Sequence, residues 1–132
     1  MLFRSGGRAA GTVRVLADLA VVLDPAAGAA AARRARLDER AGAPWSSDAG
    51  IFAGTPAELA DLLLDWQAAG LAGFRLRPAV LPHDLTQITR GLVPELRRRG
   101  AFRRDYEAAT PHTPHTLRGL LGLARPANRY AA

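Results

Sequence analysis

The stretch over residues 51–78, IFAGTPAELADLLLDWQAAGLAGFRLRP, most strongly limits the folds open to this chain. It has the pattern of a short strand, a Gly-Thr-Pro turn, an amphipathic helix and a second strand. Thr55, Pro56 and Glu58 form a capping box with proline at the first helical position, which predicts a helix start. The helix then carries one apolar stripe at i, i+3, i+4 and i+7, made of Leu59, Leu62, Leu63 and Trp66. One such unit cannot bury both of its faces, so more units are expected.

A second strand and helix precede this unit. Residues 12–23, TVRVLADLAVVL, are rich in β-branched side chains and nearly continuous in apolar character, which is typical of a parallel strand covered on both faces. Asp24 is predicted to cap the next helix, with Pro25 at its first position. That helix is expected over Ala26 to Ala41, with Gly42 in the left-handed conformation that ends it.

A third helix is predicted over Asp84 to Arg99. Asp84 and Gln87 form a further capping signal, and Pro94 is expected to kink or restart the helix. Its apolar face is supplied by Ile88, Leu92, Val93 and Leu96. Arg97 to Arg99 fall in the last turn, where cations suit the helix dipole, and are expected to be solvated.

The order strand, helix, short strand, helix, strand, helix predicts an α/β fold of right-handed parallel units. Strands are expected around Val13 to Leu23 and Phe74 to Arg77, with a brief one at residues 51–54. A (β/α)₈ barrel needs eight strands and about 250 residues, so a chain of 132 residues is expected to be an incomplete part of one. We divide it into a disordered or non-native start (1–11), the strand–helix units (12–100) and a tail (101–132) with one short helix near Leu117 to Leu121.

Composition narrows the function classes. Cysteine is absent, which excludes disulfides and a cysteine nucleophile and fits a reducing cytoplasm. The net charge is +6 with arginine as the only strong cation, a bias typical of GC-rich genomes. A phosphate-binding surface would more often mix lysine with exposed aromatics, so an Arg-rich nucleic-acid binder is the weaker alternative. The longest apolar run, residues 13–23, is broken by Arg14 and Asp18 and is too short to span a membrane.

Four polar residues are the candidates for a site. Arg77 and His83 follow the strand at 73–77, and loops after strands form the active face of a barrel, so both are candidates for a pocket rim. There Arg77 would pair with an anionic substrate or a flavin phosphate; the alternative is a solvated loop. His112 and His115 are three residues apart, but Pro111 and Pro114 prevent a regular helix, so we expect an exposed loop and no metal site. No catalytic residue stands out.

Several motifs, in order and spacing, resemble one enzyme family. They are Gly54-Thr55-Pro56 with Glu58, Gly73-Phe74, Pro82, VPELRRRG at 93–100, Tyr106-Glu107 and TLRGLLGLARP at 116–126. Together with VRVLADLAVVL they resemble the C-terminal portion of bacterial luciferase-like flavin-dependent monooxygenases, in the branch of nitrilotriacetate monooxygenase component A. One departure is the inserted AATPHTPH at 108–115.

The resemblance implies a (β/α)₈ TIM-type barrel and a cytoplasmic, homo-oligomeric full-length enzyme. It implies reduced FMN delivered by a separate flavin reductase, with O₂ and a small organic substrate. Most flavin contacts of the family lie upstream of the matching part, so the cofactor-binding residues are unknown and the 132-residue chain alone is expected to be inactive. The alternative is a non-catalytic fragment or interaction module that packs on a partner chain through its open sheet edge.

Overall fold

The structure is a computed structural model and describes residues 13–104, 117 and 126–130. The chain divides into two units, Met1–Phe102 and Arg103–Ala132. The first unit contains three strands, β1 (Leu16–Leu23), β2 (Gly50–Gly54) and β3 (Gly73–Pro78). Its helices are α1 (Ala29–Ala41), α2 (Pro56–Ala68), α3 (His83–Gln87), the π-helical η2 (Ile88–Leu92) and α4 (Val93–Arg98). Among the described residues, no helix has the length and apolar character that crossing a membrane requires.

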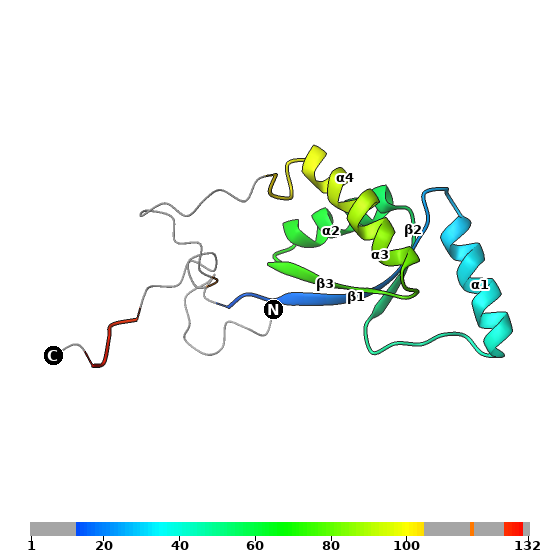
Figure 1. Ribbon diagram of the computed structural model, residues 1–132, viewed down its shortest axis with the longest axis horizontal. Coiled ribbons are helices and arrows are strands. Elements are labelled where there is room, and N and C mark those ends of the chain that lie inside the picture. Colours follow the sequence, from blue (N-terminus) through cyan, green and yellow to red (C-terminus); the bar gives the residue numbers. More distant parts are fainter. Residues whose placement is uncertain (1–12, 105–116, 118–125, 131–132) are drawn as a thin grey trace. The chain divides into compact units, whose positions relative to one another are not determined.

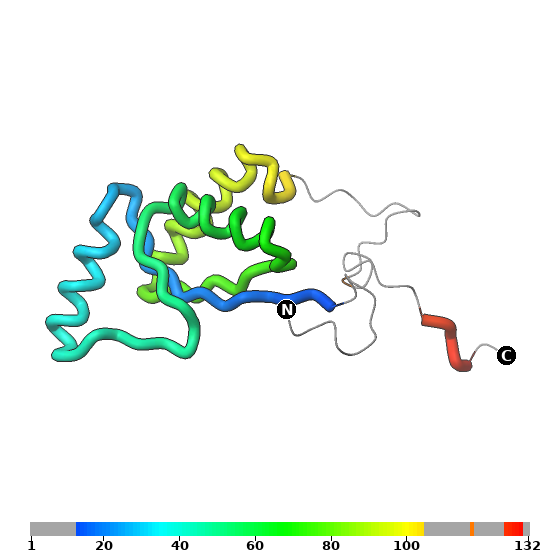
Figure 2. The backbone as a smooth tube through the Cα atoms, turned by 180° about the vertical axis from the view of Figure 1, so that it is seen from behind, coloured from blue at the N-terminus to red at the C-terminus, as the bar shows by residue number. Residues whose placement is uncertain are grey.

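The three strands form one parallel sheet in the order β2-β1-β3. Alternating strands and helices in a parallel sheet confirm the predicted α/β class. In a (β/α)₈ barrel each strand pairs with the next one along the chain, whereas here β1 lies between β2 and β3. In Figure 1, α2, α3 and α4 lie together on one side of the sheet, while α1 stands apart at the end where β1 finishes. The view from behind in Figure 2 shows the same arrangement.

The core lies between β1 and the helices that cover one face of the sheet. Leu23 and Leu59 are fully buried, and Leu92 on η2 closes the layer at 1% exposed. The four residues of the predicted α2 stripe all contact this core; Leu59 and Leu63 are buried, and Leu62 and Trp66 are partly buried. The other face of β1 is also covered near its carboxyl end, because Ala20 and Val22 are buried as well. This confirms a strand apolar on both faces.

The start of α1 differs from the prediction. The helix begins at Ala29 after Gly28, whose φ of 75° is left-handed, and no side chain caps it. Asp24 does not act as the cap, because its carboxylate is bound by Arg33 and His83 instead. A charge-assisted hydrogen bond is about twice as strong as a neutral one, so the ion pair holds this carboxylate. The predicted end is confirmed, since Gly42 has a φ of 75°.

The start of α2 is the capping box that the sequence predicts. Thr55 Oγ1 accepts a hydrogen bond from Glu58 N (3.2 Å), and Glu58 Oε2 accepts one from Thr55 N (2.7 Å). Pro56 occupies the first turn, where its missing N–H costs nothing. The cap therefore accounts for Gly54-Thr55-Pro56.

The third helical segment is split into α3, η2 and α4 rather than continuous. The π-helical turn precedes Pro94, and α4 restarts with that proline in its first turn. Proline has no N–H to donate and its ring displaces the carbonyl one turn earlier, so the extra residue of a π turn accommodates it. The predicted restart at Pro94 is confirmed.

One other expectation for this segment is wrong, and a second holds only in part. Asp84 does not cap a helix, because it is fully buried and its oxygens bind groups outside α3. The expected solvation at the end of α4 holds for Arg98, whose side chain is 71% exposed, but not for Arg99, whose side chain is 21% exposed. Arg98 and Arg99 both bind Glu95, and Arg99 also reaches Asp61 on α2.

The second unit is described only at residues 103, 104, 117 and 126–130. There Tyr130 N donates to Asn128 Oδ1 at 3.0 Å. Leu117 is helical, but the rest of the predicted tail helix lies outside the described residues. The same holds for the predicted start at 1–11 and for the insertion at 108–115.

Candidate functional site

Charged side chains gather where β1 and β3 end. β1 finishes at Leu23 and β3 at Pro78, and the chain continues from these ends into Asp24 and into α3. In open parallel sheets, ligands bind outside the carboxyl ends of the strands, at the point where strand order reverses. Here the order reverses at β1, so this edge is the natural place to look for a site. Four side chains meet there and form what we call the carboxyl-edge cluster: Asp24, Arg33, His83 and Asp84.

Asp84 is the buried anchor of the cluster. Its side chain is fully buried, and its Oδ1 accepts from Leu23 N at 2.8 Å while Oδ2 accepts from Val80 N at 2.8 Å. These bonds tie the end of β1 and the loop after β3 to the first turn of α3. Buried carboxylates are stable only when paired and hydrogen-bonded, so Asp84 fixes the relative positions of three segments.

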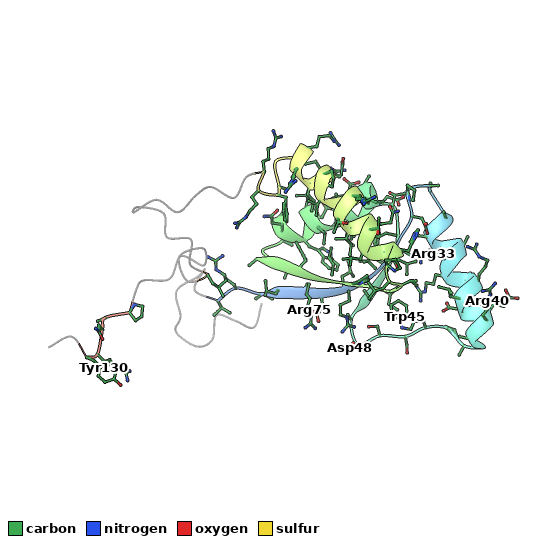
Figure 3. All side chains as sticks on the ribbon, viewed as in Figure 1. Arg33, Arg40, Trp45, Asp48, Arg75 and Tyr130 are labelled. Atoms are coloured by element: carbon green, nitrogen blue, oxygen red, sulfur yellow. The ribbon has the colours of Figure 1, made fainter. Side chains whose placement is uncertain are left out.

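Arg33 joins the two carboxylates. Its Nη2 lies 2.5 Å from Asp84 Oδ1 and 3.1 Å from Leu23 O, and its Nε lies 2.9 Å from Asp24 Oδ2. Figure 3 places Arg33 where α1 faces the rest of the unit. The opposed carboxylates raise the pKa of Arg33 against the lowering effect of burial. Its Nη1 is buried without a hydrogen-bond partner among the described residues.

His83 forms the outer part of the cluster. Its Nε2 lies 2.9 Å from Asp24 Oδ1 and 3.1 Å from Leu23 O. Burial alone would raise the pKa of Asp24, but the hydrogen bonds and charges of Arg33 and His83 outweigh it, and the pKa is lowered. The side chain of His83 is 42% exposed, so this histidine is the cluster's contact with solvent.

An open cavity of about 420 Å³ lies at the same edge. Pro25, next to Asp24 in the chain, lines it, and so does Gln87, one helical turn after His83. The remaining lining residues are Thr55, Pro56, Ala57, Arg90, Gly91 and Glu95. A Cβ on Gly91 would lie 2.7 Å from Pro56 Cγ, so η2 approaches the start of α2 as closely as glycine allows.

Arg77 does not join His83. Phe74 and Leu76 pack against the core, and side chains alternate along a strand, so Arg75 and Arg77 belong to the opposite face of the sheet. There Arg77 Nη2 lies 2.6 Å from Asp48 Oδ1 and 2.5 Å from Ser47 Oγ. Figure 3 shows Arg75 on this face, where it pairs with Asp18. An anion at Arg77 would have to compete with Asp48.

Sequence reasoning found one member of the cluster, His83, and missed its partners. Asp24 and Asp84 matched capping patterns, and Arg33 is one of several arginines in an Ala-rich helix. The available signal was an aspartate directly after the apolar run of residues 19–23, at the edge where sites form. Among the described residues, no three His, Asp or Glu side chains converge as a metal site requires; His112 and His115 lie outside that part.

Several known proteins are similar to part of this chain, although no protein-family model matches it. The chain is 40% identical over 82 residues to N-acetyl-S-(2-succino)cysteine monooxygenase of Bacillus subtilis (strain 168). It is 43% identical over 79 residues to nitrilotriacetate monooxygenase component A of Aminobacter aminovorans. It is 37% identical over 83 residues to one subunit of the pristinamycin IIA synthase of Streptomyces pristinaespiralis.

The matches cover more than half of this chain but only a small part of each relative. They cover 61%, 59% and 62% of this chain but only 17%, 16% and 18% of the three relatives. The chain therefore matches less than a fifth of the length of each curated relative. The resemblance to luciferase-like flavin-dependent monooxygenases, predicted from the sequence motifs, is confirmed by these relatives.

Proposed function

We propose that this chain is the C-terminal portion of a flavin-dependent monooxygenase with a (β/α)₈ barrel. The intact enzyme inserts one atom of O₂ into a small organic substrate, using reduced FMN from a separate flavin reductase. The observation that supports this most is identity of 37–43% to three relatives, two of them named monooxygenases. Two of the relatives are named as one component or one subunit of an enzyme, which supports a system of more than one chain.

The described residues do not make an FMN site by themselves. The carboxyl-edge cavity of about 420 Å³ is open, and it offers Arg90 to a phosphate but places Glu95 nearby. The more apolar cavity, about 370 Å³, lies among α2, β3, η2 and α4, within the helix layer. A flavin pocket combines an apolar slot for the ring with fixed donors for the phosphate. We derive no step through FMN, and we propose, as the family resemblance implies, that most flavin contacts belong to a part of the intact enzyme upstream of this chain.

Within the intact enzyme this chain has a structural role and a place at the pocket rim. The sheet order β2-β1-β3 differs from that of a barrel, so in this proposal the parallel pair β1 and β3 supplies part of the barrel wall and β2 lies beside it. The carboxyl ends of barrel strands face the side where barrel enzymes bind substrates. His83 lies at that edge, and so does the cavity that Pro25 and Gln87 line; His83 is not part of its lining. Arg77 remains a rim candidate only where a substrate anion displaces Asp48 from it. The full-length protein is expected in the cytoplasm as a homo-oligomer.

Two measurements test this proposal. Titration of the 132-residue chain with FMN, followed by flavin fluorescence, is expected to show no binding in the micromolar range and no oxidation of substrate. Sequencing of the parent locus is expected to reveal an in-frame barrel half upstream of Met1. Tight FMN binding by the chain alone would show that the flavin site has been misplaced, and an unrelated upstream reading frame would contradict the proposal.

A further inference from the structure

A further cavity, half-open and about 310 Å³ in volume, lies between α1 and the carboxyl ends of β1 and β3. We call it the α1 cavity. On the sheet side it is lined by Val22, near the end of β1, and by Ala79 and Val80, which follow β3. Val22 is 2% exposed, and Ala79 N donates to Val21 O at 3.0 Å, so this floor continues the sheet. The volume is at the lower end of the range for ligand sites, about 300–1,000 Å³, so the cavity suits a molecule with a single ring.

The helix side of the α1 cavity is one face of α1. The four residues of α1 that line it are spaced i, i+3, i+4 and i+7, which places them on the same face: Arg34, Leu37, Asp38 and Ala41. The loop after α1 adds Trp45, and within the described part of the chain this is the only aromatic residue of the lining. Leu37 is 43% exposed and Trp45 is 39% exposed. Apolar surface left open around a cavity is typical of a binding site.

The backbone of Trp45 is held by α1. Its N–H donates to Asp38 Oδ1 at 2.9 Å, and its carbonyl oxygen accepts from Arg34 Nη2 at 3.5 Å. Arg34 and Asp38 also pair with each other, with 3.7 Å between Nε and Oδ2. Figure 3 places Trp45 between α1 and the strands. The aromatic residue is therefore positioned before any ligand arrives, which lowers the entropic cost of binding.

Arg34 has hydrogen-bonding capacity to offer a ligand. A guanidinium has five N–H donors. Both contacts of Arg34 among the described residues, at 3.5 and 3.7 Å, are longer than an ordinary N–H···O bond. Its side chain is 32% exposed. Asp38, in contrast, already accepts the short bond from Trp45 N. The lining therefore offers donors more than acceptors.

The charge of α1 also favours an anion. The helix carries four arginines and two acidic residues. A carboxylate can accept two parallel, charge-assisted hydrogen bonds from one guanidinium. A cationic ligand would instead approach a helix with an excess of positive charge. Charge complementarity therefore selects an acid.

We propose that the α1 cavity binds a small aromatic carboxylate. The ring of the ligand packs on Trp45, over the floor made by Val22 and Ala79, and its carboxylate binds the guanidinium of Arg34. Contacts between aromatic rings add to the free energy of binding beyond the area that they bury. Binding at this cavity requires no flavin, so its failure and the failure of the monooxygenase proposal are separate results.

Tryptophan fluorescence of the full 132-residue chain tests the proposal. The chain has two tryptophans, and Trp66 packs against the core, so Trp66→Phe leaves Trp45 as the only one. Benzoate is expected to quench Trp45 saturably in the millimolar range, which suits a ligand of this size. Benzylamine has the same ring with the opposite charge, and acetate has no ring. Both are expected to bind at least tenfold more weakly. In Trp45→Phe, benzoate should leave the emission of Trp66 unchanged.

Two arginine variants locate the carboxylate. Arg34→Gln keeps an amide donor for the Trp45 carbonyl but has no charge, and it should weaken benzoate binding about five- to tenfold. Arg36 is exposed on α1 and is not part of the lining, so Arg36→Gln is the matched control and should bind benzoate as the parent does. Saturation-transfer NMR of benzoate repeats this comparison in chains that keep both tryptophans.

The opposite results would overturn the proposal. Without saturable quenching of Trp45, the cavity would be left to a segment of protein. Equal binding of benzylamine would remove the role of the carboxylate, and an equal loss in Arg34→Gln and Arg36→Gln would remove the role of Arg34. An equal response of Trp66 in Trp45→Phe would place benzoate elsewhere on the chain.

Discussion

Arg33 on α1 and Asp84 on α3 form an ion pair between residues 51 apart in the chain, with 2.5 Å between Nη2 and Oδ1. Asp84 is fully buried and the side chain of Arg33 is 17% exposed. The pair closes over the end of β1, because both side chains also bind the backbone of Leu23. It therefore connects α1, which Figure 1 shows apart from the other helices, to the main core.

Removal of the Asp84 carboxylate should strongly lower the free energy of unfolding. Asp84→Ala leaves Arg33 without its buried partner and two backbone N–H groups, of Leu23 and Val80, without acceptors. Breaking a buried pair in this way costs about 3–5 kcal/mol. Urea denaturation followed by circular dichroism checks this. Asp65→Ala, at an exposed carboxylate on α2, is the matched control and should change stability little; a similar small effect at position 84 would contradict the structure.

The approach of η2 to α2 predicts a steric effect. In Gly91→Ala the new Cβ would meet the Pro56 ring at 2.7 and 3.1 Å. A proline ring cannot rotate away, so the backbone must shift, and overpacking of this kind costs about 1–3 kcal/mol. Gly50→Ala is the control, since its Cβ meets only the tip of Leu19 at 3.4 Å. Equal melting temperatures for the two variants would contradict this packing.

The lowered pKa of Glu95 predicts that the stability of the fold depends on pH in the acid range. Hydrogen bonds from Arg98 and Arg99 lower the pKa of Glu95 from 4.5 to about 2. Because the folded pKa is below the unfolded one, the ionised carboxylate favours the folded state. This contribution is complete above about pH 4.5 and is lost as the pH falls toward 2. Glu95→Gln should flatten the fall in melting temperature across this window, whereas Glu39→Gln, at an exposed site on α1, should not.

The sequence predicted the local elements well and their contacts poorly. The capping box at Thr55 and the restart at Pro94 follow from backbone chemistry within a few residues, so the sequence pattern was sufficient. The roles of Asp24 and Asp84 depend on Arg33, which lies 9 and 51 residues away. A short polar side chain before a helix resembles a cap whether or not a distant guanidinium binds it. The central position of β1 likewise depends on pairing between distant segments.

The open edges of the sheet predict self-association. Among the described strands, β2 and β3 each have one neighbour, and an unpaired strand edge is a template for another chain. The half-open cavity of about 370 Å³ lined by Leu63, Phe74 and Leu96 leaves apolar surface beside the core uncovered. The purified chain is therefore expected to be oligomeric, aggregated or molten, and the stability comparisons above are made on its soluble oligomeric fraction. A monomer by analytical ultracentrifugation with a sharp two-state melting transition would show that these elements form a complete domain.

The most direct test of the proposed function is an exchange of segments. The matching 79 residues of this chain would replace their counterpart in nitrilotriacetate monooxygenase component A of Aminobacter aminovorans. Oxidation of nitrilotriacetate would then be measured with the proposed cofactor, reduced FMN, supplied, and with a chimera carrying an unrelated βα segment of equal length as control. We predict that the first chimera folds, binds FMN and keeps measurable oxidation, while the control does not. A well-folded first chimera that binds no FMN and oxidises no substrate would contradict the assignment of this chain to a flavin-dependent monooxygenase barrel.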